Sequence, residues 1–140
     1  MKGDRTSEGE KKPLRILYLE DNEADHDLVR FQLSRQRLPH ELVWAPTLEQ
    51  FMARLEGEVF DVVLCDSSGP KFDSGKAVEF ARRRIPSAAF IFLTGHSPGP
   101  AIEMMSQLGA DGVLRKDDIA HLGATISRIA EGKRAGDQSL

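Results

Sequence analysis

The chain has one cysteine among its 140 residues and no apolar run near the length of a membrane span. A single cysteine excludes an internal disulfide and a multi-cysteine metal cage, and it fits a reducing compartment. A spanning helix needs about 18 apolar residues in succession, so we expect no membrane contact. The chain also lacks an excess of positive charge, because 19 basic residues stand against 22 acidic ones. This balance attracts neither nucleic acid nor an anionic membrane, and we expect a cytoplasmic protein.

The two ends of the chain are polar. Residues 1–13 have Met1 as their only large apolar side chain and lack the apolar stretch of a signal peptide. We expect a flexible tail at 1–13 and a second one at 132–140. The chain as a whole is 40% hydrophobic and 29% charged, which is typical of a soluble globular protein. Residues 14–131 are therefore expected to form a single domain.

Short apolar runs alternate with segments of helical periodicity along that domain. Because strands joined by single helices run parallel with right-handed crossovers, the pattern predicts an α/β fold. The simplest such fold is a three-layer (βα)5 sandwich, whose five-stranded parallel sheet has the flavodoxin-like order 2-1-3-4-5. The apolar runs predict strands at 15–19, 41–45, 60–65, 89–93 and 112–114, and the periodic segments predict helices at 22–36, 47–57, around 77–81, at 100–109 and at 118–131.

Polar side chains follow four of the predicted strands. Glu20 and Asp21 come after the first strand and Asp66 after the third, while Thr94 and Lys116 come after the fourth and fifth. The first and third strands are neighbours in the order 2-1-3-4-5, so three carboxylates meet at one sheet edge. Carboxylates this close raise one another's pKa unless a cation neutralises them. Ligands that are all oxygen atoms suit Mg²⁺ (or Mn²⁺). A lysine and a hydroxyl beside them could stabilise the negative charge of an oxyanion.

Four motifs carry a family resemblance. They are ILYLEDN, FDVVLCD with Pro70 four residues after its aspartate, FIFLTG, and GADGVLRK. Their order and spacing resemble those of the response-regulator receiver domains of two-component signalling. The resemblance implies that Asp66 accepts a phosphoryl group from a sensor histidine kinase, a phosphotransfer protein or a small donor such as acetyl phosphate. It also implies that Thr94 and Lys116 contact the phosphoryl group.

The same resemblance implies a metal site. Mg²⁺ would be held by Glu20, Asp21 and Asp66, with help from the backbone carbonyl of Ser68. The protein would be a signalling module and not an enzyme, acting as a monomer or weak homodimer. Its output would be a switched protein-interaction surface, since no DNA-binding, cyclase or kinase segment follows residue 131.

Several positions depart from the family pattern. Gly69 replaces the usual bulky residue before Pro70, which predicts a looser loop after the third strand. Val113 stands where many members have an aromatic residue that swings inward on activation, so we expect no aromatic switch there. Asp117 follows Lys116 where the family usually has a cis proline. A cis bond to another residue costs about 3 kcal/mol, so we predict a trans bond and a reshaped loop.

Two alternatives remain open at this point. A pseudo-receiver would bind partners without phosphorylation, and the atypical loop at 67–75 keeps this hypothesis alive. A phosphatase with Asp66 as its nucleophile would usually need a second acid two residues later, where this chain has Ser68.

Overall fold

The fold is built on one parallel sheet. The computed structural model describes residues 12–66, 73–95, 103 and 106–138. Within them the strand order is β2-β1-β3-β4-β5, and every neighbouring pair runs parallel. The predicted fold class and strand order are confirmed. The strands are β1 (Leu14–Leu19), β2 (His40–Ala45), β3 (Val62–Asp66), β4 (Ala89–Thr94) and β5 (Gly112–Arg115).

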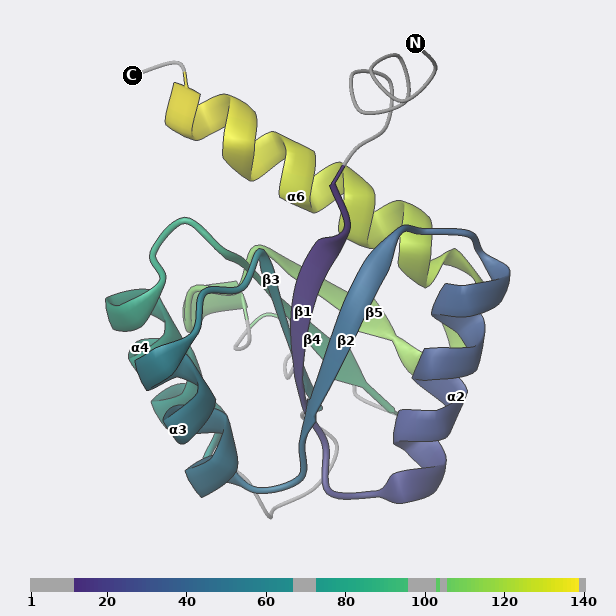
Figure 1. The fold of residues 1–140 in the computed structure, drawn as a ribbon, viewed down its shortest axis with the longest axis horizontal. Helices are drawn as coiled ribbons and strands as arrows, with labels where there is room; N and C mark the ends of the chain where they lie inside the picture. Colours follow the sequence, from purple (N-terminus) through teal and green to yellow (C-terminus); the bar gives the residue numbers. More distant parts are fainter. Residues whose placement is uncertain (1–11, 67–72, 96–102, 104–105, 139–140) are drawn as a thin grey trace, which may run out of the picture.

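Helices cover both faces of the sheet (Figure 1). Two of them, α3 and α4, lie on one side, and α2 and α6 lie on the other. The helix expected at 100–109 falls largely outside the described residues. No helix in the described part of the chain combines the length and the apolar character that a membrane crossing needs. The helical elements are α2 (Glu23–Arg35), α3 (Leu48–Gly57), α4 (Ser74–Arg84), the 3-10 segment η1 (Lys116–His121) and α6 (Leu122–Gln138).

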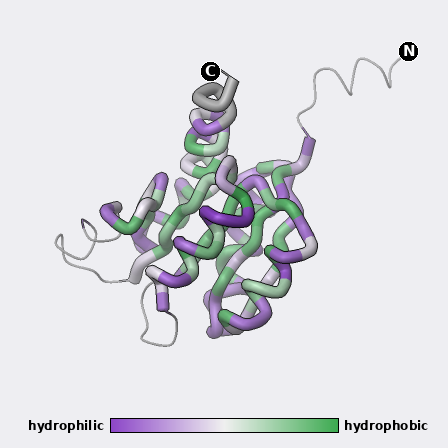
Figure 2. The backbone as a smooth tube through the Cα atoms, turned by 90° about the vertical axis from the view of Figure 1, so that its left-hand side faces the viewer, coloured by the Kyte–Doolittle hydropathy of each residue, from purple (hydrophilic) through white to green (hydrophobic). Residues whose placement is uncertain are grey.

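Each face of the sheet has its own hydrophobic core. Side chains of a strand alternate between faces, so Leu17 and Val63 pack towards α3 and α4. Tyr18 and Leu64 pack towards α2 and α6 instead. All five residues of β3 are buried, as expected for a central strand covered on both sides. Figure 2 shows the mainly hydrophobic strands enclosed by helices in which hydrophobic and hydrophilic residues alternate.

Side-chain caps explain where three helices begin. The Asn22 Oδ1 atom accepts a hydrogen bond of 2.9 Å from the backbone N–H of Asp25 at the start of α2. Thr47 caps α3 in the same way, with 3.1 Å to the N–H of Gln50. Asp73 caps α4. Each cap satisfies a backbone donor that has no partner inside its helix.

Two aspartates tie the starts of strands to their neighbours. Asp61, just before β3, donates its N–H to the Arg15 carbonyl at 2.8 Å and accepts the Arg15 N–H on Oδ2 at 2.9 Å. Asp111, just before β5, makes the same exchange with Phe90 of β4, at 2.7 and 2.8 Å. We call these residues the strand-start aspartates. Because Asp61 bonds in this way, β3 begins at Val62 and not at residue 60 as predicted.

The end of the chain differs from expectation. The polar segment after residue 131 was expected to be a tail, but α6 continues through it to Gln138. Figure 1 shows α6 crossing above the amino end of β1, with its C-terminal end projecting beyond the sheet. Extending an existing helix adds one hydrogen bond per residue without a new nucleation step, so no apolar periodicity is needed there. The proposed domain boundaries remain predictions.

Candidate functional site

Three carboxylates meet at the carboxyl edge of the sheet, at the bottom in Figure 1. Glu20 follows β1, Asp66 ends β3, and Asp25 lies in the first turn of α2. One oxygen from each lies within 4.8 Å of the other two. The pairing of Leu19 with Cys65 brings Glu20 and Asp66 together, as the predicted strand order requires. Glu20 is fully buried and Asp66 is 6% exposed.

The third member of this acidic group was not predicted. Asp25 lies within the helix expected at 22–36 and was not among the expected ligands. The Asn22 cap on its backbone fixes the first turn of α2 next to the end of β1. The sequence signal that could have found Asp25 was a capping residue, Asn22, followed three residues later by an acidic one. Asp21 is exposed and lies outside this group, and Ser68 falls outside the described residues, so their proposed roles as ligands remain predictions.

Lys116 joins the three carboxylates. It follows β5, and its Nζ atom donates a hydrogen bond of 3.0 Å to Asp25. The same atom lies 3.4 Å from an oxygen of Asp66 and 3.6 Å from an oxygen of Glu20. Burial alone would lower the pKa of Lys116, but the bond to Asp25 and the charges of the other two carboxylates outweigh it and raise the pKa. The lysine therefore stays charged among the carboxylates.

The trans bond expected before Asp117 is confirmed. The described residues contain no cis peptide bond, so Lys116 and Asp117 are joined in trans. The 3-10 segment η1 begins at Lys116 and leads directly into α6. Lys116, directly after β5, thus reaches the site although no proline follows it.

The buried carboxyl of Glu20 is electrostatically perturbed. Burial, followed by the charge of Asp66, raises its pKa to about 7. The Tyr18 hydroxyl donates a hydrogen bond of 2.9 Å to Glu20 and opposes this shift. A second donor is the Asn22 backbone N–H, at 3.2 Å from the other carboxylate oxygen. One lysine does not neutralise the negative charge gathered here.

An aromatic group supports Glu20 from the side of β2. The Trp44 Nε1 atom donates a hydrogen bond of 2.6 Å to the Glu20 carbonyl. The Trp44 ring stacks on His26 of α2, with centroids 4.3 Å apart and planes inclined by 11°. His26 in turn faces the Tyr18 ring at 6.2 Å. Because Tyr18 and Trp44 are partners in the sheet, this group links β1, β2 and α2 directly behind the carboxylates.

Thr94 ends β4 and is fully buried. The register pairs Asp66 with Leu93 and Thr94 with Arg115. Thr94 therefore lies one residue further towards the carboxyl edge of the sheet than Asp66. Its other neighbour is β5, the strand that ends just before Lys116. This placement brings a hydroxyl to the same edge of the sheet as the carboxylates.

Comparison with known families adds to this geometry. The sequence profile of the response regulator receiver domain matches residues 16–127. The chain belongs to the response-regulator receiver family. No curated protein matches the chain.

Solved receiver structures share the fold of this receiver. A CheY-like receiver domain protein from Methanospirillum hungatei is 23% identical, with a TM-score of 0.76 and coverage of 89% of this chain and 99% of the other. A receiver domain protein from Clostridium thermocellum is 24% identical, with a TM-score of 0.73 and coverage of 87% and 98%. The receiver domain of a histidine kinase from Syntrophus aciditrophicus is 17% identical, with a TM-score of 0.72 and coverage of 85% and 91%.

The acidic group of this receiver suits a hard divalent cation. Its donors are all carboxylate oxygens, and they lie close enough together to share one ion. Burial and the neighbouring charge of Asp66 raise the pKa of Glu20, and a bound cation would oppose both effects. The family typically binds Mg²⁺ at such an acidic cluster, and the donors of this chain fit that ion.

Proposed function

We propose that this receiver accepts a phosphoryl group on Asp66 from a sensor histidine kinase or a phosphotransfer protein, with Mg²⁺ (or Mn²⁺) as its cofactor. The supporting observation is the placement of a buried aspartate at the end of a central strand, 3.4 Å from a lysine ammonium and beside two further carboxylates. Receivers are signalling modules, and we propose a cytoplasmic protein that catalyses only its own phosphorylation and dephosphorylation.

The chemistry is a phosphoryl transfer. A carboxylate oxygen of Asp66 attacks the phosphorus of a phosphohistidine, the P–N bond breaks, and the imidazole nitrogen leaves with the bonding electron pair. Lys116 lies close enough to Asp66 to offset the negative charge of the transferred group. The Thr94 hydroxyl, at the same edge, is proposed to donate a hydrogen bond to a phosphoryl oxygen.

The metal would be held by carboxylates of this chain. We propose Glu20, Asp66 and Asp21 as its protein ligands, together with the Ser68 carbonyl and with Asp25 beside them. Bound there, Mg²⁺ supplies positive charge that stabilises the phosphoryl oxygens during transfer.

Phosphorylation would redistribute the contacts of Lys116. An aspartyl phosphate adds about −1.5 to −2 charge units at pH 7. The Lys116 ammonium now shared with Asp25 would turn towards the phosphoryl oxygens, and Thr94 would follow. These two residues lie at the ends of β4 and β5, so the segments after those strands would change the surface offered to a partner.

Treatment with acetyl phosphate and Mg²⁺, followed by intact mass spectrometry, tests the proposal. We expect the wild-type chain to gain the mass of one phosphoryl group and Asp66→Ala to gain none. The exposed Asp118→Ala variant is the matched control and should be labelled like the wild type. Beryllofluoride with Mg²⁺ gives a second measurement, because Trp44 fluorescence should respond to a change at Glu20.

Three outcomes would overturn the assignment. An adduct that survives in Asp66→Ala would place the modification elsewhere. A wild-type chain that forms no adduct with acetyl phosphate or beryllofluoride would instead favour a pseudo-receiver. Steady release of phosphate from many equivalents of a phosphate ester would indicate a phosphatase.

A further inference from the structure

A second site is hollowed out at the opposite edge of the sheet. A pocket of about 510 Å³ lies against the amino end of β1, the segment between α2 and β2, and the surface of η1 and α6. Its volume is within the range of pockets that hold small organic ligands. It shares no residue with the acidic group, which lies at the carboxyl edge. A phosphoacceptor site does not explain it.

The Gln36 side chain joins the end of α2 to η1 and the start of α6. The Gln36 amide donates a hydrogen bond of 3.0 Å to the Ile119 carbonyl, and its oxygen accepts one of 2.6 Å from the Gly123 N–H. A Cβ atom on Gly123 would lie only 2.9 Å from that oxygen, so a larger residue there would displace the Gln36 side chain from this position. The end of α2 and the start of α6 are thus joined, and the pocket is formed before any ligand arrives.

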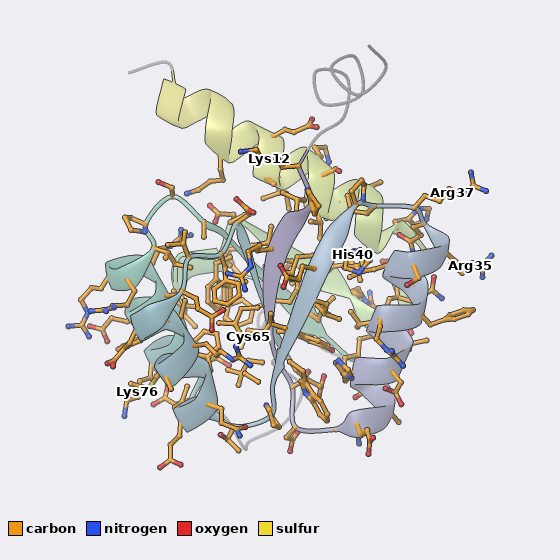
Figure 3. The ribbon with its side chains drawn as sticks, in the orientation of Figure 1. Lys12, Arg35, Arg37, His40, Cys65 and Lys76 are labelled. Atoms are coloured by element: carbon orange, nitrogen blue, oxygen red, sulfur yellow. The ribbon has the colours of Figure 1, made fainter. Side chains whose placement is uncertain are left out.

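The rim of the pocket carries more cationic than anionic side chains. Lys12 and Arg37 line it, and neither side chain takes part in a hydrogen bond or ion pair within the described residues. Figure 3 shows Lys12 at the start of β1 beside α6, and Arg37 past the end of α2 with its side chain extended outward. The one lining carboxylate, Glu131, is already engaged in an interaction.

Arg37 occupies an unfavourable backbone conformation. Its φ of 60° lies in the left-handed region, which side chains with a Cβ atom rarely adopt. The chain uses glycine for a comparable position, since Gly109 has a φ of 106°. Arg37 follows the C-cap of α2, and its backbone N–H donates to the Ser34 carbonyl at 3.3 Å, so this conformation ends the helix and sets Arg37 beside the pocket.

The interior of the pocket is mostly apolar, with Leu14, Leu38, Pro39 and Ala130 among its lining residues. Apolar walls below a cationic rim match a molecule with an apolar body and an acidic group. We propose that this pocket binds a small amphiphilic anion, that is, an organic molecule with a hydrocarbon or aromatic body and one carboxylate, sulfonate or phosphate group. The Lys12 and Arg37 side chains hold the acidic group, and the body lies against the apolar walls.

The probe for this test is 1-anilinonaphthalene-8-sulfonate, which combines an aromatic body with a sulfonate. We expect its fluorescence to rise saturably with a stoichiometry of one per chain. Decanoate should displace it, whereas decyltrimethylammonium, with the same tail and opposite charge, should not. A probe that binds without saturation, or that both detergents displace equally, would overturn the proposal.

Variants locate the binding site. Arg37→Gly removes the charge and relieves the left-handed backbone, so it should weaken probe binding about fivefold without lowering stability. Ala124→Leu adds bulk on the pocket side of α6 and should weaken binding through volume alone. Arg35→Ala, the exposed neighbour outside the lining, is the matched control and should bind like the wild type. Unchanged affinity in Arg37→Gly or in Ala124→Leu would refute the proposed location.

A final variant separates this site from the phosphoacceptor. Asp66→Ala should retain full probe affinity, because Asp66 lies at the other edge of the sheet. If Asp66→Ala lost probe binding while remaining folded, the probe would be bound at the acidic site and the pocket proposal would fail. Failure of acetyl phosphate to label Asp66 would leave the expected probe affinities unchanged, so the two proposals are tested separately.

Discussion

The strand-start aspartate of β5 offers a quantitative test of how the sheet is held together. Asp111→Ala removes the carboxylate that accepts the Phe90 N–H at 2.8 Å. The same carboxylate accepts a hydrogen bond from Arg82 at 2.9 Å and lies 3.5 Å from the Lys133 ammonium. The substitution therefore leaves a backbone donor without its partner at the start of β4 and also breaks two ion pairs.

The magnitude follows from these separate losses. A buried donor left unsatisfied costs about 1–3 kcal/mol. The ion pairs join partly exposed side chains, so each contributes at most about 1 kcal/mol. We expect Asp111→Ala to lower the free energy of unfolding by about 2–3 kcal/mol. Asp111→Asn keeps an oxygen for the Phe90 N–H and loses only the charge, so its cost should stay near 1 kcal/mol.

Urea denaturation followed by Trp44 fluorescence measures both variants. A slope of about 2 kcal/mol per molar urea turns the alanine loss into a midpoint shift of about 1 M. The exposed Asp118→Ala serves as the control and should shift the midpoint very little. If Asp111→Ala were no less stable than Asp111→Asn, the bond to the strand would not carry the effect and the reasoning would be refuted.

Three further predictions concern the site and the edge of the sheet. Trp44→Phe removes the N–H that binds the Glu20 carbonyl, so Mg²⁺ affinity measured by calorimetry should fall several-fold; unchanged affinity would count against this support. Lys116→Gln leaves buried carboxylates without their ammonium and should lower metal-free stability in urea by about 2 kcal/mol, and a neutral effect would contradict the electrostatic account. Hydrogen bonds from Arg15 lower the pKa of Glu58, so Glu58 stabilises the fold above its unfolded pKa and loses this effect as pH falls through the folded pKa. Glu58→Gln should therefore lower the free energy of unfolding at pH 7 but not at pH 3. An equal loss of stability at both pH values would refute a stabilising role for the bond between Arg15 and Glu58.

The sheet and the central site residues could be predicted because their signals are local. Glu20 and Asp66 directly follow or end an apolar run and Lys116 comes two residues after one, and parallel strands bring such positions to one edge. Asp25 was missed because its contribution depends on how the capped first turn of α2 lies against the end of β1. Trp44 was predicted only as a strand residue, and its bond to the Glu20 carbonyl depends on the register between β1 and β2.

The sequence by itself determined the order of strands and helices, the two-sided burial of β3 and the identity of the residues at the strand ends. These features follow from periodicity and turn chemistry within a few residues of each other. The tertiary structure alone decided which groups come into contact. Lys116 bonds to Asp25 across 91 positions of sequence, and Gln36 joins Gly123 across 87. Such contacts depend on the packing of α2 and α6 against the sheet, and no local pattern in the chain encodes their distances.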